Sequence, residues 1–167
     1  SLRGSCQDAA IFYAMLLIGA GCDPLLLFRR LIVHSAEDVG LADPNALTIS
    51  VSAMTAFEKI GLPEGLRPFT EALIYVCNAP KSDSVVKAME EAQAVAEEGH
   101  DDVPYYLRDK NFKLDKPVGY KYPHDYGGYV EQQYLPTDIK DKVFYVPSNN
   151  GDEKFYHGVW NRKGDIK

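Results

Sequence analysis

Apolar residues recur at helical spacing through the first 99 residues of the chain. The segment "AAIFYAMLLIGA", from Ala9 to Ala20, is almost wholly apolar, and glycines at positions 19 and 21 follow or close it. Ser5 stands three residues before Asp8, which is the spacing of a helix capping box. The segment is shorter than the roughly 20 residues of a membrane span and lacks the basic flank of a signal peptide. It therefore predicts a buried helix.

Two Asp-Pro pairs mark the starts of the next two predicted helices. Asp23-Pro24 precedes "LLLFRRLIVHSAED", and Asp43-Pro44 precedes the third helical pattern. Aspartate caps a helix well, and proline is tolerated at the first helical position because its missing N–H has no partner there. The third pattern carries two apolar stripes: Ile49, Ala53, Ala56 and Ile60 in one, and Leu47, Val51 and Met54 in the other. It predicts a central helix that is covered on two sides.

Two further helices complete the pattern. The fourth spans about Pro63 to Asn78, and Pro80 ends it. In the fifth, five residues share one apolar face, four glutamates point outward and Gly99 supplies the stop; the apolar face is Val85, Ala88, Met89, Ala92 and Val95. Five helices with short connections predict an all-α fold, a bundle of about five helices.

The composition and the periodicity of the sequence change after Gly99. Nine of the eleven tyrosines and five of the ten prolines lie in residues 100–167, and no helical period lasts longer than a turn or two. The aromatic content argues against disorder. We expect one structural domain, with residues 1–99 as the helical bundle and residues 100–167 as a long, mostly irregular Tyr/Pro-rich extension packed on it.

Charge and cysteine content indicate which partners and which cellular compartment to expect for the chain. The net charge is −6, and all of it falls in residues 1–99, which carry seven Lys and Arg against thirteen Asp and Glu. An acidic surface repels duplex DNA, so any DNA role needs help from elsewhere. The three cysteines form no C-x-x-C pair. This usage favours a reducing, cytoplasmic setting, and no membrane partner is expected.

The usual signatures of catalysis are missing from the sequence. There is no Walker loop and no zinc motif. The four histidines at 34, 100, 124 and 157 are widely separated, which favours structural or solvated roles for them. Glu37, Asp38 and Asp43 suggest a cation site or an acid/base pair, but a helix cap and a polar turn explain them better. We expect no catalytic, cofactor-binding or metal-binding residue, and no enzyme activity from this chain alone.

The segment "VGYKYPHDYGGYVEQQYLP", from Val118 to Pro136, admits two interpretations. In one, Arg108, Lys121, Tyr122 and His124 form a docking face for single-stranded DNA or a replication protein, with tyrosines stacking on bases. In the other, the rings pack against the bundle or between subunits. Basic residues are too sparse for the groove that stacking usually accompanies, so packing is favoured. It predicts a buried Tyr122 ring.

Several stretches together resemble one known family. They are "SLRGSCQDAA", "RRLIVHSAEDVGLADP", "APKSDSV", "VPYYLRD", "GYKYPHDY", "QQYLP" and "FYVP". This combination resembles the C-terminal region of the replication-associated recombination protein A family, also called MgsA, which are clamp-loader-like AAA+ ATPases. Two stretches depart from the family pattern, at Cys6-Gln7 and at Lys81-Ser82-Asp83.

The resemblance implies a part of a larger machine. It implies a helical domain that follows the ATPase core and assembles the protein into a homotetramer, so that the chain's partners are its own copies and the N-terminal AAA+ core of the same polypeptide. ATP and Mg are expected in that core, and DNA or replication proteins are possible partners of the full-length protein in the cytoplasm, associated with the nucleoid. The alternative is a DNA- or partner-binding module that uses the Tyr-rich segment.

Overall fold

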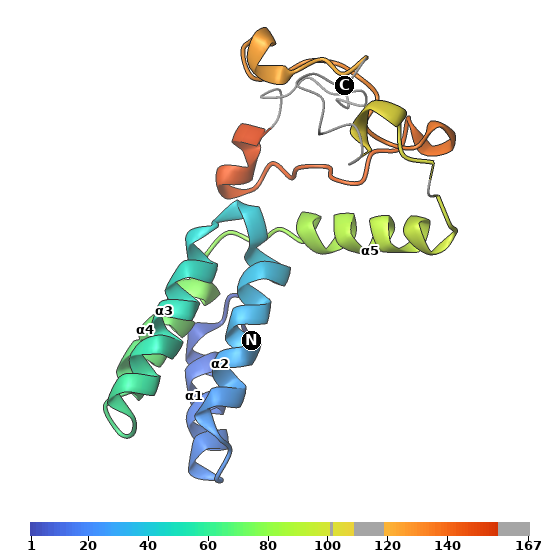
Figure 1. Cartoon of the computed structure of the whole chain (residues 1–167). Coiled ribbons are helices and arrows are strands. Elements are labelled where there is room, and N and C mark those ends of the chain that lie inside the picture. Colours follow the sequence, from blue (N-terminus) through green and yellow to red (C-terminus); the bar gives the residue numbers. More distant parts are fainter. Residues whose placement is uncertain (101, 109–118, 157–167) are drawn as a thin grey trace. The chain divides into compact units, whose positions relative to one another are not determined.

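The computed structural model describes residues 1–100, 102–108 and 119–156, and every regular element in that part of the chain is helical (Figure 1). This confirms the predicted all-α fold with about five helices. Val118 and His157 lie outside the described residues. No helix of the described part has the length and apolar character needed to cross a bilayer. The five α-helices are α1 (Gln7–Gly19), α2 (Pro24–His34), α3 (Asn45–Ile60), α4 (Leu66–Asn78) and α5 (Ser84–Glu97).

The chain divides into two compact units. The first contains residues 1–88 together with the segment that begins at Tyr145, and the second contains residues 89–144, as far as these are described. α5 crosses the boundary between them in the sequence. The division into residues 1–99 and 100–167 stays a prediction.

Helices α1 to α4 form a bundle in the first unit (Figure 1). α4 packs against α1 and α3, and α3 packs against α2. Phe28 of α2 is fully buried at the centre, where its ring lies 4.9 Å from the ring of Phe69 and 5.2 Å from that of Phe57. Aromatic rings at such distances add to the stability that burial itself provides. The core thus rests on contacts between α2, α3 and α4.

Both predicted aspartates accept a hydrogen bond at the start of their helix, although the residue directly before α3 is Pro44. The Asp23 carboxylate accepts a hydrogen bond from the Leu25 N–H at 3.0 Å, and the Asp43 carboxylate accepts one from the Asn45 N–H at 3.1 Å. Each satisfies a donor that the first turn of a helix leaves without a partner. The predicted cap at Ser5 is wrong, because α1 begins after Cys6 without a side-chain cap.

Two predicted buried faces are only partly buried. On α3, Ala46, Ser50 and Ala53 face the core, but Leu47 and Val51 of the second stripe are exposed. On α5, Val95 is buried whereas Met89 is exposed. Helical spacing shows which residues share a face, but not whether another element covers that face.

The described part of the C-terminal extension is irregular, as predicted. It contains only short 3-10 turns: Tyr105–Leu107, Pro123–Tyr126, Thr137–Ile139 and Gly151–Tyr156. The last of these turns packs against the 3-10 turn Gly40–Ala42, which lies between α2 and α3. The end of the described chain therefore completes the first unit.

Candidate interaction surface

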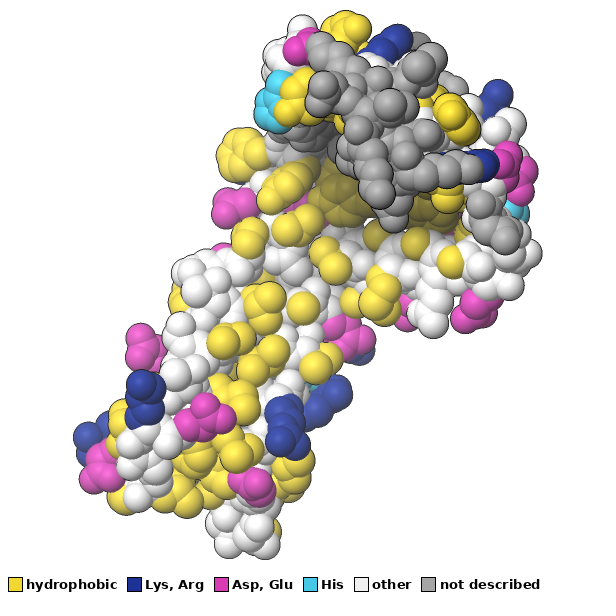
Figure 2. Space-filling view, viewed as in Figure 1, with side chains coloured by type: hydrophobic (Ala, Val, Ile, Leu, Met, Phe, Trp, Pro, Cys, Tyr) yellow, Lys and Arg dark blue, Asp and Glu magenta, His cyan; other side chains and the backbone are white. Residues whose placement is uncertain are grey.

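Helix α1 exposes four of its large apolar side chains, so the prediction of a buried helix from Ala9 to Ala20 is wrong for this face. Only Ala10 and Ala14 of this helix are buried. Phe12 is 61% exposed, Tyr13 and Leu16 are each 56% exposed, and Leu17 is 46% exposed. We call these four residues the α1 surface. Figure 2 shows apolar side chains at many places on the bundle, with charged groups between them.

The α1 surface is compact and uncharged. Its four residues are one turn apart in pairs, at 12, 13, 16 and 17, and the rings of Phe12 and Tyr13 meet edge to face at 5.4 Å. No charged residue occurs between Ala9 and Cys22. A helix that is apolar all round is normally buried, and contiguous exposed apolar patches usually mark interaction sites. The arrangement is suited to binding another protein surface.

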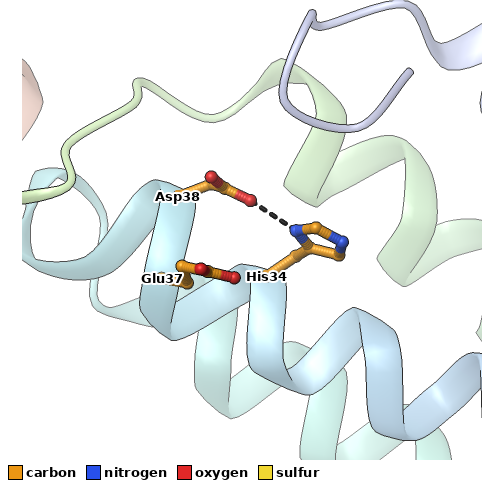
Figure 3. A group of neighbouring side chains, drawn as sticks. All are labelled: His34, Glu37 and Asp38. Atoms are coloured by element: carbon orange, nitrogen blue, oxygen red, sulfur yellow. Dashed lines mark hydrogen bonds and ion pairs between the residues drawn. The ribbon is translucent and has the colours of Figure 1, made fainter. Parts of the chain in front are cut away.

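Asp38 is the centre of a polar cluster at the end of α2 (Figure 3). One of its carboxylate oxygens accepts a hydrogen bond from Arg3 Nε at 2.6 Å, and the other is hydrogen-bonded to His34 Nδ1. Burial by itself raises the pKa of Asp38, but the hydrogen bonds to His34 and Arg3 outweigh burial and hold that pKa below its usual value. The carboxylate is therefore already satisfied by protein groups.

The structure separates the carboxylates that the sequence grouped together. Glu37 lies beside His34 and Asp38, and ligand atoms of these three residues lie within 4.8 Å of one another. Asp43, by contrast, caps α3 and accepts a hydrogen bond from the Tyr75 hydroxyl at 2.7 Å. Sequence reasoning missed the link from Arg3 to Asp38. The pairing of His34 with Asp38 could have been found from their spacing of four residues.

Glu153 forms a second cluster, which is fully buried. Its side chain is 0% exposed and accepts hydrogen bonds from three hydroxyl groups: those of Ser84, Tyr145 at 2.9 Å and Ser148 at 2.5 Å. Burial raises the pKa of this carboxyl, yet the hydroxyl donors bring it below the usual value. Nothing in the sequence pattern pointed to this residue.

Residues of the "APKSDSV" stretch connect these two clusters. The Lys81 ammonium donates to the carbonyls of Val76, Cys77 and Ala79, where α4 ends. Ser82 N–H donates to the Asp38 carbonyl at 2.8 Å, and Ser84 reaches Glu153. Asp83, one of the departures from the family pattern, makes an exposed ion pair with Lys87 at 2.9 Å. The stretch is structural, because each polar group in it stabilises a helix end or a connection.

The four residues predicted as a docking face lie in the second unit. Arg108 donates to the Val103 carbonyl at 2.9 Å and forms an ion pair with Asp102 at 3.2 Å, so its charge is compensated locally. The Gln132 side-chain amide binds both the N–H and the carbonyl of Lys121, at 3.1 and 2.8 Å. The rings of Tyr122 and His124 lie 5.1 Å apart. The structure thus brings Tyr122 and His124 together beside Lys121.

The predicted burial of the Tyr122 ring is wrong, since 46% of this residue is exposed. Other residues anchor the segment instead. The Tyr106 hydroxyl donates to the Gln133 carbonyl at 2.5 Å, and the Tyr106 ring lies 6.4 Å from that of Tyr120. Val130 is buried. The segment therefore has an anchored side and an exposed side, and Tyr122 belongs to the exposed one.

The fold and the α1 surface define a helical domain with a face suited to another protein. The sequence matches the family described as MgsA AAA+ ATPase C terminal over residues 4–163, so the chain belongs to that family.

Several relatives are similar over most of the chain. An uncharacterized protein of Thermotoga maritima is 44% identical over 92% of this chain, which corresponds to 26% of that protein. The replication-associated recombination protein A of Bacillus subtilis is 43% identical over 90% of the chain and 37% of the relative. The protein of the same name in Escherichia coli K12 is 39% identical over 92% of the chain and 36% of the relative. The chain thus spans little more than a third of these relatives, or less.

Proposed function

We propose that this chain is the self-assembly domain of an AAA+ ATPase that acts in replication-associated recombination. The family and the names of the relatives support the link to recombination. The α1 surface supports self-assembly, because its four exposed apolar residues lie together in a stretch of the helix without charge. Exposed apolar residues cost solvation free energy unless a partner covers them.

The domain would act indirectly. ATP and Mg would bind in the ATPase part of the longer polypeptide, and this chain would take no part in hydrolysis. By joining several copies, as a tetramer, it would raise the effective concentration of the ATPase cores and place the active site of one subunit beside its neighbour. The assembled protein would work on DNA in the cytoplasm, at the nucleoid.

A concentration series measured by light scattering tests the proposal. We expect the isolated chain to form a stable oligomer, with a mass near four times that of one chain, at tens of micromolar. A chain that remains strictly monomeric over that range would contradict self-assembly through this domain.

One observation supports a second function, a binding module for single-stranded DNA. Tyr122 and His124 present two neighbouring rings, and Gln132 fixes the backbone of Lys121 beside them. Such rings can stack on bases. Binding driven by phosphate contacts weakens steeply as salt rises. If the chain produces no shift with single-stranded DNA at low salt, this second function is excluded.

A further inference from the structure

We propose that two copies of this chain pair through α1 in antiparallel orientation, about a twofold axis that passes between Ala14 and Met15. In this arrangement Phe12 and Tyr13 of one copy pack on Leu17 and Leu16 of the other. The inference rests on the proposed self-assembly function and adds to it the contact surface and its geometry.

The absence of charge on the α1 surface favours a second copy as the occupant. In a twofold interface the same patch is used by both copies, so a charge near the axis meets its like. Such pairs are unfavourable when water is removed. Between Ala9 and Cys22 the helix has no charge that could do this. α1 itself carries a single charge, Asp8 in its first turn, and α3 carries Glu58 and Lys59 only in its last turn. Helices α2 and α4 carry charges further from their ends, at Arg29 and Arg30 and at Glu71.

The distribution of side-chain sizes around α1 supports the same conclusion. The helix packs Ala10, Ala14 and the partly buried Ile11 and Met15 against its own bundle, and it turns its two aromatic rings toward the outside. Two rings that are more than half exposed present about 100 Å² each. With the two leucines, α1 offers roughly 400 Å², about half of what one partner contributes to a standard interface. α1 would thus form the centre of the contact, and neighbouring surface would supply the rest.

The shape of the surface favours the antiparallel orientation. The edge-to-face pair of Phe12 and Tyr13 protrudes further from the helix than the smaller Leu16 and Leu17, which follow one turn later. In an antiparallel pair the aromatic rings of one copy pack against the leucines of the other, whereas a parallel pair would place rings against rings. The antiparallel orientation also places each helix N-terminus beside the partner's C-terminus, where the helix dipoles attract.

Two natural cysteines allow a test without any substitution. Cys6 is exposed just before α1, and Cys22 is half-buried just after it. They are sixteen positions apart, which corresponds to roughly 24 Å within one chain at a rise of about 1.5 Å per residue. A bismaleimide that spans about half that distance cannot join them within one chain. In the antiparallel pair, Cys6 of one copy lies near Cys22 of the other.

The experiment is reaction of the oligomeric chain with this reagent, followed by peptide mapping. We expect a covalent dimer joined from Cys6 to Cys22, and we expect Cys6→Ser or Cys22→Ser to abolish it. A dimer joined from Cys6 to Cys6 would show a parallel pair and overturn the inference. An oligomer with no cross-link across α1 would also overturn it while leaving self-assembly intact. A monomeric chain would overturn both.

A second pair of variants tests the axis directly. In a chain with Cys6→Ser and Cys22→Ser, Tyr13→Cys and Leu16→Cys are prepared separately and then mixed under mild oxidation. Disulfides require Cα atoms about 4.4–6.8 Å apart. We expect the mixed disulfide, identified by its mass, to exceed both homodimeric disulfides, and Ile60→Cys to form none. A predominance of the homodimer of Tyr13→Cys would contradict the proposed axis.

Discussion

Ser84, the first residue of α5, donates a hydrogen bond to the carboxylate of Glu153, which lies 69 residues later in the chain. The contact joins the start of α5 to the segment that ends the described chain. Because the N-terminus of a helix carries a partial positive charge, it favours a carboxylate at this place. Through its bonds to the hydroxyls of Ser84, Tyr145 and Ser148, Glu153 fixes residues 145–156 to the start of α5 in the first unit.

Replacing Glu153 by Gln should destabilise the first unit. The amide keeps the size of the side chain but loses the charge that the three hydroxyl donors stabilise, which should cost about 1–3 kcal/mol. The measurement is the free energy of unfolding in denaturant at neutral pH. Glu58→Gln, on the exposed side of α3, is the matched control and should change stability by less than about 0.5 kcal/mol.

The same variant should alter the acid dependence of stability. The pKa of Glu153 is lower in the folded chain than in the unfolded one. Its stabilising contribution is therefore present above the unfolded pKa and is lost as the pH falls through the folded pKa. The difference in melting temperature between wild type and Glu153→Gln should shrink from pH 7 toward pH 3. A constant difference would show that the charge of Glu153 does not contribute.

Gly151→Ala should be the most damaging of the glycine substitutions in the first unit. A Cβ at this position would lie 2.2 Å from the Ala42 carbonyl oxygen, and the φ angle of 52° is itself unfavourable for alanine. Gly21 has a φ of 92° with open space around it, so Gly21→Ala isolates the effect of backbone strain. We expect a clearly larger loss of melting temperature for Gly151→Ala. Equal losses would mean that residues 145–156 do not lie against Gly40–Ala42.

His100 should titrate at a higher pH than an ordinary histidine. Its ring is hydrogen-bonded to Glu98 at 3.0 Å and to Asp138 at 2.5 Å, and both contacts raise the pKa of His100. A raised pKa means that the contribution to stability is complete below the unfolded pKa, near 6.5, and is lost as the pH rises through the folded pKa. An NMR titration of the ring should show the raised pKa, and Glu98→Gln or Asp138→Asn should lower it. An unchanged value in both variants would refute these contacts.

Two tyrosines of the extension should differ sharply in their effect on stability. Tyr122 is exposed, so Tyr122→Ala should alter the free energy of unfolding by less than about 0.5 kcal/mol. If the ring were buried, as the sequence predicted, the same substitution would lower the free energy of unfolding by about 3–5 kcal/mol. Tyr106→Phe removes the hydrogen bond to the Gln133 carbonyl and should cost about 1 kcal/mol. The prediction fails if Tyr122→Ala is the more harmful of the two in thermal unfolding.

The helices and two of their caps could be predicted because their causes are local. Helical spacing, Asp23, Asp43, and the glycine and proline stops act within a few residues of where they stand. The start of α4 differed by three residues, since Pro63 precedes the helix rather than opening it. Element boundaries depend on weak end effects, which sequence patterns define less well than they define the element itself.

The clusters of the first unit could not be predicted, because each joins residues far apart in the chain. Arg3 meets Asp38, and Ser84 meets Glu153, only after the helices and the final segment have packed. The exposure of a helix face could not be predicted from the sequence for a related reason. The apolar spacing of α1 and of Leu47 and Val51 is the same whether a face is covered by its own chain or left for a partner. The proposed self-assembly would explain why the apolar face of α1 is exposed in a single chain.

The most direct test of self-assembly through α1 is sedimentation velocity on two matched variants. Leu16 and Ile60 are 56% and 55% exposed, both on helices of the bundle, so glutamate at either position should leave the fold intact, which thermal unfolding checks. We predict that Leu16→Glu sediments as a monomer at concentrations where wild type and Ile60→Glu remain oligomeric, because the buried charge would oppose the contact. If Leu16→Glu sediments as the wild-type oligomer does, α1 does not form the subunit interface.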